Sequence, residues 1–209
     1  SDVCSSDLLG AIAGYDAKDP YSSRKLVPDY TQELKQGVAG LRIAVIRELF
    51  NHNDMDPDVR SSIEDSLNVF RELGAEIKEV SIPLVELAGA IFVGIADTEG
   101  AGARDEILRN RPFDLDPASR TRLQSAALVP HKIYNRAAKA RVLLRRQFME
   151  ALEETDILVS PTSPYPAPLH ISLTARFDSA EDVRNRFFFR RAYTGCYALT
   201  ALPAISIPG

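Results

Sequence analysis

Hydrophobic positions in the first third of the chain predict a strand, a helix and a second strand. The compact apolar run Leu41–Ile46 is typical of a buried strand. We predict that a helix follows, with Asp56 as its N-cap, Pro57 in its first turn and Gly74 at its end. The alternating pattern of residues 75–82 then predicts the second strand. A unit of this kind favours a parallel or mixed sheet covered by helices, and therefore an α/β fold.

Two long helices and one short strand are predicted farther along the chain. The helix after Pro83 carries apolar side chains at helical spacing, and the next position on that face is Glu99. The helix over residues 130–154 has an apolar face interrupted by Arg141, and residues 156–159 predict a short buried strand. Because an unpaired buried charge is strongly unfavourable, we expect Glu99 and Arg141 to form a buried, hydrogen-bonded ion pair with a structural role.

The C-terminal segment Arg190–Gly209 is apolar after its first two residues. A helix predicted over residues 179–191 leads into it, and Leu202–Pro208 has the short, β-branched pattern of an interior strand entered through a proline. Isolated hydroxyl groups such as those of Thr194 and Ser206 must either find hydrogen-bond partners in the core or line a pocket.

The first residues do not share the pattern of the rest. Back-translation of residues 1–8 matches the end of a widely used DNA-sequencing adapter, so we expect this segment, with Cys4, to be a translated artefact that stands outside the fold. Residues 9–13 then predict the last turns of a helix closed by Gly14. We expect the native chain to continue beyond both ends.

Composition narrows the class of protein. With 45% hydrophobic and 26% charged residues, the chain is expected to be globular, and no apolar run reaches the roughly 18 residues of a membrane span. A net charge of −4 gives no general attraction to nucleic acid or to an anionic membrane. The basic cluster Lys132–Arg146 is interpreted as a solvated helix face. Two cysteines and no secretory signal favour a cytoplasmic location.

The sequence lacks the motifs of several common kinds of active site. No nucleophile elbow, phosphate loop or dinucleotide fingerprint occurs, and no cofactor is expected. Ser22–Lys25 matches Ser-x-x-Lys, but the match lies in a predicted loop, so we set it aside as catalytic. Asp114 and Asp116 beside Pro117 are interpreted as turn and cap residues. No metal site is expected, because the three histidines are far apart in the sequence: His52, His131 and His170.

Five segments of residues 9–209 carry a shared pattern, in this order: Leu9–Pro20, Val38–Val45, Leu73–Ile77, Asp156–Thr162 and Leu202–Pro208. In their order and spacing they resemble the amidase signature family. The resemblance implies that residues 9–209 are the C-terminal portion of a single amidase domain.

The resemblance implies a large α/β domain with a mixed central sheet covered by helices. It also implies hydrolysis of a small-molecule carboxylic amide by a Ser-cisSer-Lys triad, in which the lysine acts through the bridging serine and backbone N–H groups hold the oxyanion. In this family those residues precede the matching region, so the resemblance assigns no catalytic residue to this chain. We therefore expect the chain alone to be inactive.

The resemblance also places the motif Tyr193-Thr194-x-x-Tyr197 beside the substrate in related hydrolases of fatty amides. We predict that Thr194 lines the acyl side of the substrate pocket, with Tyr193 and Tyr197 as further candidates. Core packing remains the alternative for each of the three side chains.

Departures from the family pattern bear on the substrate. Relatives often have Asn and Gly where this chain has Ala198 and Ala201, and a substrate-recognising Asp of the glutamine-using amidotransferase aligns with Arg191. An arginine cannot accept hydrogen bonds from an α-ammonium group. A general amidase is therefore the leading interpretation. The alternatives are the A subunit of an aspartyl/glutamyl-tRNA amidotransferase and a non-catalytic binding domain with the same fold.

Overall fold

The structure is a computed structural model that divides into two compact units, residues 1–39 and 40–209. The first unit contains α1 (Ser5–Ile12), followed by Gly14. This helix was predicted over residues 9–13, and it begins within the segment that we set apart as an artefact. The residues described are 5–32, 36–51, 55–167, 179, 181 and 188–207.

Some predictions fall outside these residues. Cys4, His52 and His170 are not described, nor are Pro208 and Gly209. Most of the helix predicted over residues 179–191 is likewise outside the described ranges.

A small parallel sheet lies in the second unit. Its strands are β1 (Arg42–Ile46), β2 (Glu76–Val80) and β3 (Ile157–Val159), in the order β2-β1-β3. The residues of β1 after Arg42 are all buried, as expected for a central strand covered on both faces. The predicted α/β class and the strands predicted at residues 41–46, 75–82 and 156–159 are confirmed, and the described strands are all parallel.

Helix α3 (Pro57–Glu72) connects β1 to β2 and packs against β2. The carboxylate of Asp56 accepts a hydrogen bond from the Asp58 N–H at 2.9 Å, so it caps the helix as predicted. Gly74 follows the helix with φ of 90°, a conformation that glycine adopts readily.

Helices make up most of the rest of this unit. Short helical turns occur at Pro83–Leu87, at Val93–Asp97, where the turn is a π-helix, and at Pro112–Asp114. The α-helices are α2 (Arg47–Phe50), α4 (Ala88–Phe92), α5 (Thr98–Ala103), α6 (Asp105–Asn110), α7 (Pro117–Ala127), α8 (His131–Glu153) and α10 (Arg190–Thr200).

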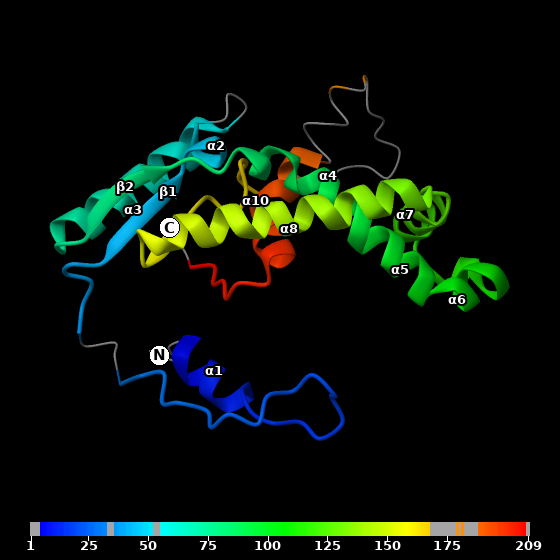
Figure 1. Cartoon of the computed structure of the whole chain (residues 1–209), viewed down its shortest axis with the longest axis horizontal. Helices are drawn as coiled ribbons and strands as arrows, with labels where there is room; N and C mark the ends of the chain where they lie inside the picture. Colours follow the sequence, from blue (N-terminus) through cyan, green and yellow to red (C-terminus); the bar gives the residue numbers. More distant parts are fainter. Residues whose placement is uncertain are drawn as a thin grey trace. The chain divides into compact units, whose positions relative to one another are not determined.

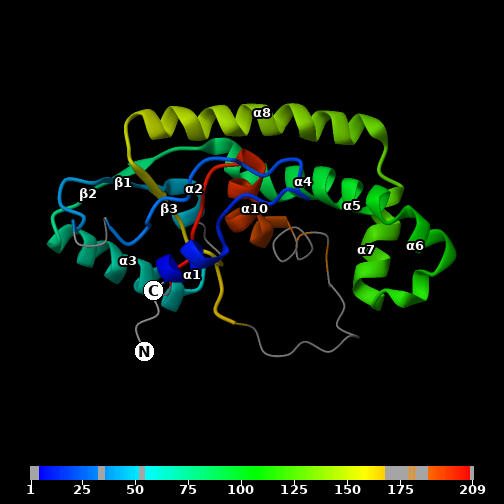
Figure 2. The ribbon, with the colours of Figure 1, turned by 90° about the horizontal axis from the view of Figure 1, so that it is seen from below.

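The main core lies where α4, α8 and α10 pack together. Figures 1 and 2 show α8 lying beside α4 and crossing α10, with the sheet near one end of α8 and α5, α6 and α7 near the other. Leu144 and Phe148 of α8 are fully buried, as are Tyr193 and Cys196 of α10. A second, smaller hydrophobic cluster lies between α5 and α7 and contains Ala101, Leu123 and Ala126.

The basic residues of α8 lie on its outer surface, as predicted for the cluster Lys132–Arg146. Lys132, Arg136, Lys139 and Arg146 are exposed, so the basic cluster is a solvated helix face. No helix within the described ranges is both long enough and apolar enough to cross a membrane.

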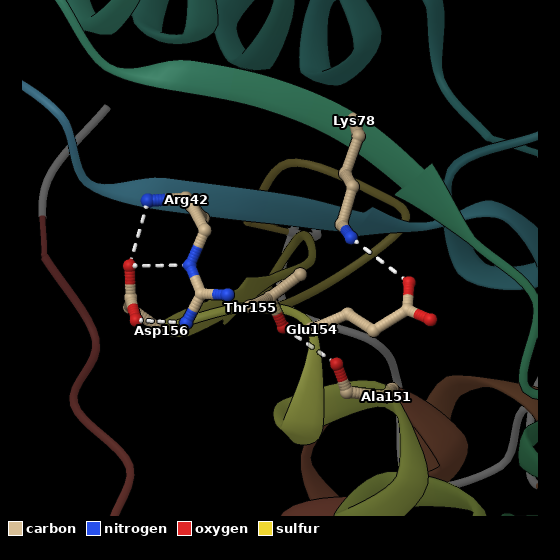
Figure 3. Close-up of polar contacts among 6 residues, drawn as sticks. All are labelled: Arg42, Lys78, Ala151, Glu154, Thr155 and Asp156. Atoms are coloured by element: carbon tan, nitrogen blue, oxygen red, sulfur yellow. Dashed lines mark hydrogen bonds and ion pairs between the residues drawn. The ribbon is translucent and has the colours of Figure 1, made fainter.

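Hydrogen bonds join β1 to β3 at one end of the sheet (Figure 3). The Asp156 carboxylate contacts the Arg42 guanidinium at 2.7 Å, and Lys78 of β2 reaches Glu154 at 3.2 Å. Thr155, which lies between Glu154 and Asp156 in the sequence, is buried, and its hydroxyl donates a hydrogen bond to the Ala151 carbonyl at 2.8 Å.

Two predictions of secondary structure need correction, and α7 was missed. Residues 202–207 form no strand, and the side chains of Ile205 and Ile207 are 76% and 63% exposed. An apolar run becomes a strand only where a neighbouring strand pairs with it, and its sequence does not supply that partner. The predicted helix after Pro83 is divided by the π turn Val93–Asp97, and α7, which was not predicted, buries only Leu123 and Ala126.

Candidate functional site

Helix α10 separates the predicted substrate residues onto two faces. Ala192, Tyr193, Cys196 and Leu199 face the core. The open face carries Arg191, Thr194 and Ala198 at helical spacing, and Thr194 is exposed. We take this open face as the candidate substrate surface, because the hydroxyl of Thr194 is exposed on it and Arg191 lies one helical turn earlier on the same face.

Tyr193 is placed in the core. Its side chain is fully buried, and its hydroxyl donates to the Leu49 carbonyl at 2.9 Å. Its ring also packs edge-on against Phe189, with ring centroids 5.1 Å apart. The Tyr193 phenol has no exposed surface, and its hydroxyl is already hydrogen-bonded within the protein. The structure therefore favours a core-packing role for Tyr193 over contact with a substrate.

Tyr197 lies at the border between the core and the open face. Its hydroxyl is 2.7 Å from the Ser160 Oγ, and its ring meets Phe148 edge-on at 5.7 Å. Burial raises the pKa of the Tyr197 phenol, so the group is neutral in the physiological range. Tyr197 can therefore donate or accept a hydrogen bond but cannot act as a phenolate base.

Charged side chains gather beside the N-terminal end of α10. Asp97, at the end of the π turn, is buried, and its Oδ1 is 3.7 Å from the Arg122 Nε. Burial lowers the pKa of the half-buried Arg191, while the nearby Asp97 raises it and Arg122 lowers it. We call Asp97, Arg122 and Arg191 the arginine–aspartate cluster. Its guanidinium groups are of the kind that binds a carboxylate on a ligand.

From the sequence we predicted that Glu99 is the buried carboxylate of this segment, whereas the structure buries Asp97. The π turn Val93–Asp97 interrupts the regular α-helical register, and in this segment Asp97 and Ala101 are buried whereas Glu99 is exposed. A usable signal was present, because the glycines of this segment, Gly89 and Gly94 among them, are typical of an irregular helix.

The predicted ion pair between Glu99 and Arg141 is therefore corrected. Both residues are described, both are exposed, and each has a different partner. Glu99 accepts a hydrogen bond from the Tyr134 hydroxyl at 2.8 Å, and Arg141 donates from Nε to the Leu199 carbonyl at 2.9 Å. Arg145 donates to the Thr200 carbonyl, so two arginines of α8 bind the last carbonyl groups of α10.

One further motif of the sequence, Asp116 before Pro117, has a structural role. Asp116 caps α7 by accepting from the Ala118 and Ser119 N–H groups, which confirms its assignment as a cap. Within the described part of the chain, no group of three or more His, Cys, Asp and Glu side chains could hold a metal ion.

Comparisons with known proteins agree on one family. The Amidase family model matches residues 5–209. The A subunit of glutamyl-tRNA(Gln) amidotransferase from Chromohalobacter salexigens is 32% identical over 225 residues, covering 96% of this chain and 44% of that protein. An amidase of Pseudomonas putida is 34% identical over 160 residues, covering 77% of this chain and 34% of its own length. The chain thus spans less than half the length of these curated relatives.

Solved structures extend the likeness to the fold. The inhibitor-bound form of a vestigial protein complex that reveals the origins of an s-triazine catabolic enzyme matches with a TM-score of 0.72. That match has 26% identity and covers 91% of this chain and 41% of the other. The A subunit of glutamyl-tRNA(Gln) amidotransferase from Thermotoga maritima has a TM-score of 0.67 at 24% identity, covering 91% of this chain and 41% of that one.

Proposed function

Because this chain belongs to the amidase signature family, we propose that it forms part of an enzyme that cleaves the C–N bond of a carboxylic amide. The family match over residues 5–209 is the observation that carries the proposal. In that enzyme the Ser-cisSer-Lys triad implied by the resemblance lies in the sequence outside this chain. The residues described here would supply a substrate-binding surface rather than the reacting groups.

The arginine–aspartate cluster supports an amide that carries a carboxylate. Arg122 keeps 45% of its side chain exposed beside the buried Asp97. Its guanidinium could therefore bind a ligand carboxylate, and Thr194 on the open face of α10 would contact the neighbouring part of the substrate.

Among specific activities, the relatives favour the A subunit of a glutamyl-tRNA(Gln) amidotransferase over the stand-alone amidase that led the sequence interpretation. The objection to that subunit was that Arg191 cannot accept hydrogen bonds from an α-ammonium group. Asp97 places a carboxylate in the same cluster, but it is buried and already contacts Arg122 at 3.7 Å. In this form of the proposal, the amide is that of glutamine.

A stand-alone amidase remains the second candidate. The Pseudomonas putida amidase is similarly close in sequence, and Arg191 still replaces the aspartate expected for glutamine recognition. The two candidates differ in substrate, because the amidotransferase component releases ammonia from glutamine whereas a stand-alone amidase acts on other amides.

The test is release of ammonia by the whole protein that contains this chain. L-glutamine would be compared with neutral aliphatic and aryl amides, using wild type, Arg191→Ala and the matched control Arg190→Ala, which changes an exposed neighbour on the same helix. Turnover of glutamine that falls with Arg191→Ala alone supports the amidotransferase. Turnover of neutral amides only supports the stand-alone amidase. An absence of turnover with every amide would contradict the enzyme proposal and favour a binding domain.

A further inference from the structure

Two tyrosines of α10 tie this helix to the elements that follow two neighbouring strands. Tyr193 binds the carbonyl of Leu49, which lies in α2 directly after β1. Tyr197 binds Ser160, the residue directly after β3. Because β1 and β3 are paired and parallel, both tyrosines attach α10 near the same edge of the sheet, at the carboxyl ends of its strands.

The two attachments differ in their surroundings. The Tyr193 bond lies wholly within the core, as its full burial shows. The Tyr197 bond is only partly buried, and Tyr197 lies one helical turn after Thr194 of the open face. The Ser160 hydroxyl also contacts the Pro161 carbonyl at 3.4 Å, so it joins the loop after β3 to α10.

Ligands of open α/β sheets bind beyond the carboxyl ends of the strands. We propose that the hydrogen bond between Ser160 and Tyr197 positions the open face of α10, with Arg191 and Thr194, for the substrate. Ser160 and Tyr197 are thus positioning residues that act through the helix and need not touch the substrate. This inference rests on the proposed function, since it requires an amide substrate at the open face.

The physical reason for a catalytic effect is geometric. A misplacement of about 1 Å at a substrate-binding group can reduce the rate roughly 10²-fold. The Phe148 ring still packs against residue 197 after Tyr197→Phe, so the helix would shift slightly rather than detach. A neutral hydroxyl pair of this kind contributes little to global stability, because its hydrogen bond replaces bonds to water.

The experiment uses the whole protein and two amides that differ in the acyl group. Tyr197→Phe and Ser160→Ala should each change the ratio of kcat/KM between the two amides about tenfold, and the double variant should do no more than either single one. Ser160→Thr keeps the hydroxyl and should restore the wild-type ratio. Thr162→Val is the matched control, because it removes the 3.0 Å hydroxyl contact of the same loop with Ser206 and leaves α10 untouched.

The outcomes separate this inference from the proposed function. A wild-type protein that hydrolyses no amide contradicts the proposed function and, with it, a substrate role for the pair. An active wild type whose variants lose thermal stability but keep the same kcat/KM ratio overturns the positioning role alone. Additive effects in the double variant would overturn it as well, because two residues acting through one bond cannot contribute independently.

Discussion

The carboxylate of Asp156 accepts three hydrogen bonds from one residue, Arg42. They come from the backbone N–H at 2.9 Å, from Nε at 3.2 Å and from Nη2 at 2.7 Å (Figure 3). The Asp156 N–H donates in return to the Arg42 carbonyl at 2.8 Å. The hydrogen bonds from the side chain and from the backbone of Arg42 lower the pKa of Asp156 to about 2. This contact fixes β3 beside β1.

The lowered pKa predicts a pH-dependent stability. A carboxyl with a depressed pKa stabilises the folded state above its unfolded value, near 3.9, and this contribution disappears as the pH falls through about 2. Asp156→Asn should therefore lower the urea midpoint at pH 7 and change it less at about pH 2.5. The effect should be small, because the side chains of Arg42 and Asp156 are 46% and 37% exposed.

Glu154→Gln is the control for this prediction. It breaks the contact with Lys78 in the same region, but the Glu154 side chain is 79% exposed, so little change is expected at either pH. An equal loss for Asp156→Asn at both pH values would show that the charge of Asp156 is not the cause.

Ala201 ends α10 in the left-handed conformation, with φ of 51°. Glycine adopts this conformation without the steric penalty that a Cβ brings. Ala201→Gly should raise the free energy of unfolding by about 1 kcal/mol, measured by urea unfolding. Ala198→Gly, inside the same helix, should lower it by about the same amount. If both variants were destabilised alike, the left-handed cap would be refuted.

Gly89 lets α4 approach the backbone just before α10. A Cβ added to Gly89 would overlap the carbonyl oxygen of Phe188, whereas one added to Gly102 of α5 would meet no atom within 4 Å. Gly89→Ala should destabilise the protein by about 1–3 kcal/mol, and Gly102→Ala should stabilise it by about 0.5–1 kcal/mol. Thermal unfolding of the two variants checks this close approach, and a tolerated Gly89→Ala would disprove it.

Thr194 should control substrate choice more than stability. Its side chain is exposed, so Thr194→Val leaves no unsatisfied buried group, but it removes the hydroxyl from the open face. We expect relative kcat/KM values across amides of increasing acyl length to change by several-fold, with an unchanged melting temperature. Thr121→Val, on α7, is the control. Identical relative values in wild type and variant would place Thr194 outside the substrate site.

Local signals predicted the fold well where they were strong. The Asp56-Pro57 start and Gly74 end of α3, both flanking strands and the long helix α8 could all be predicted from capping residues and apolar spacing. The chain could not indicate whether Leu202–Pro208 has a strand beside it, because pairing depends on residues distant in sequence or outside this chain. Regular spacing likewise could not anticipate the π turn.

The candidate site could likewise be predicted only in part, because some of its contacts join residues that are distant in the sequence. Thr194 and Arg191 were predicted from a resemblance, and they do share one face of α10. Asp97 and Arg122 were not predicted, because the π turn and the packing of α7 bring them together from different helices. Tyr197 was predicted as a residue of the site, but its bond to Ser160 joins positions 37 residues apart and could not be predicted.

The measurement that tests the central claim most directly compares the isolated chain with the whole protein that contains it. Both would be assayed for ammonia release from glutamine and from aryl and aliphatic amides. We expect turnover by the whole protein and none by the isolated chain, because loss of even one member of a serine hydrolase triad lowers the rate about 10⁴-fold or more. Turnover by the isolated chain that persists in Ser22→Ala and Lys25→Ala variants, or a whole protein inactive on every amide, would contradict the claim.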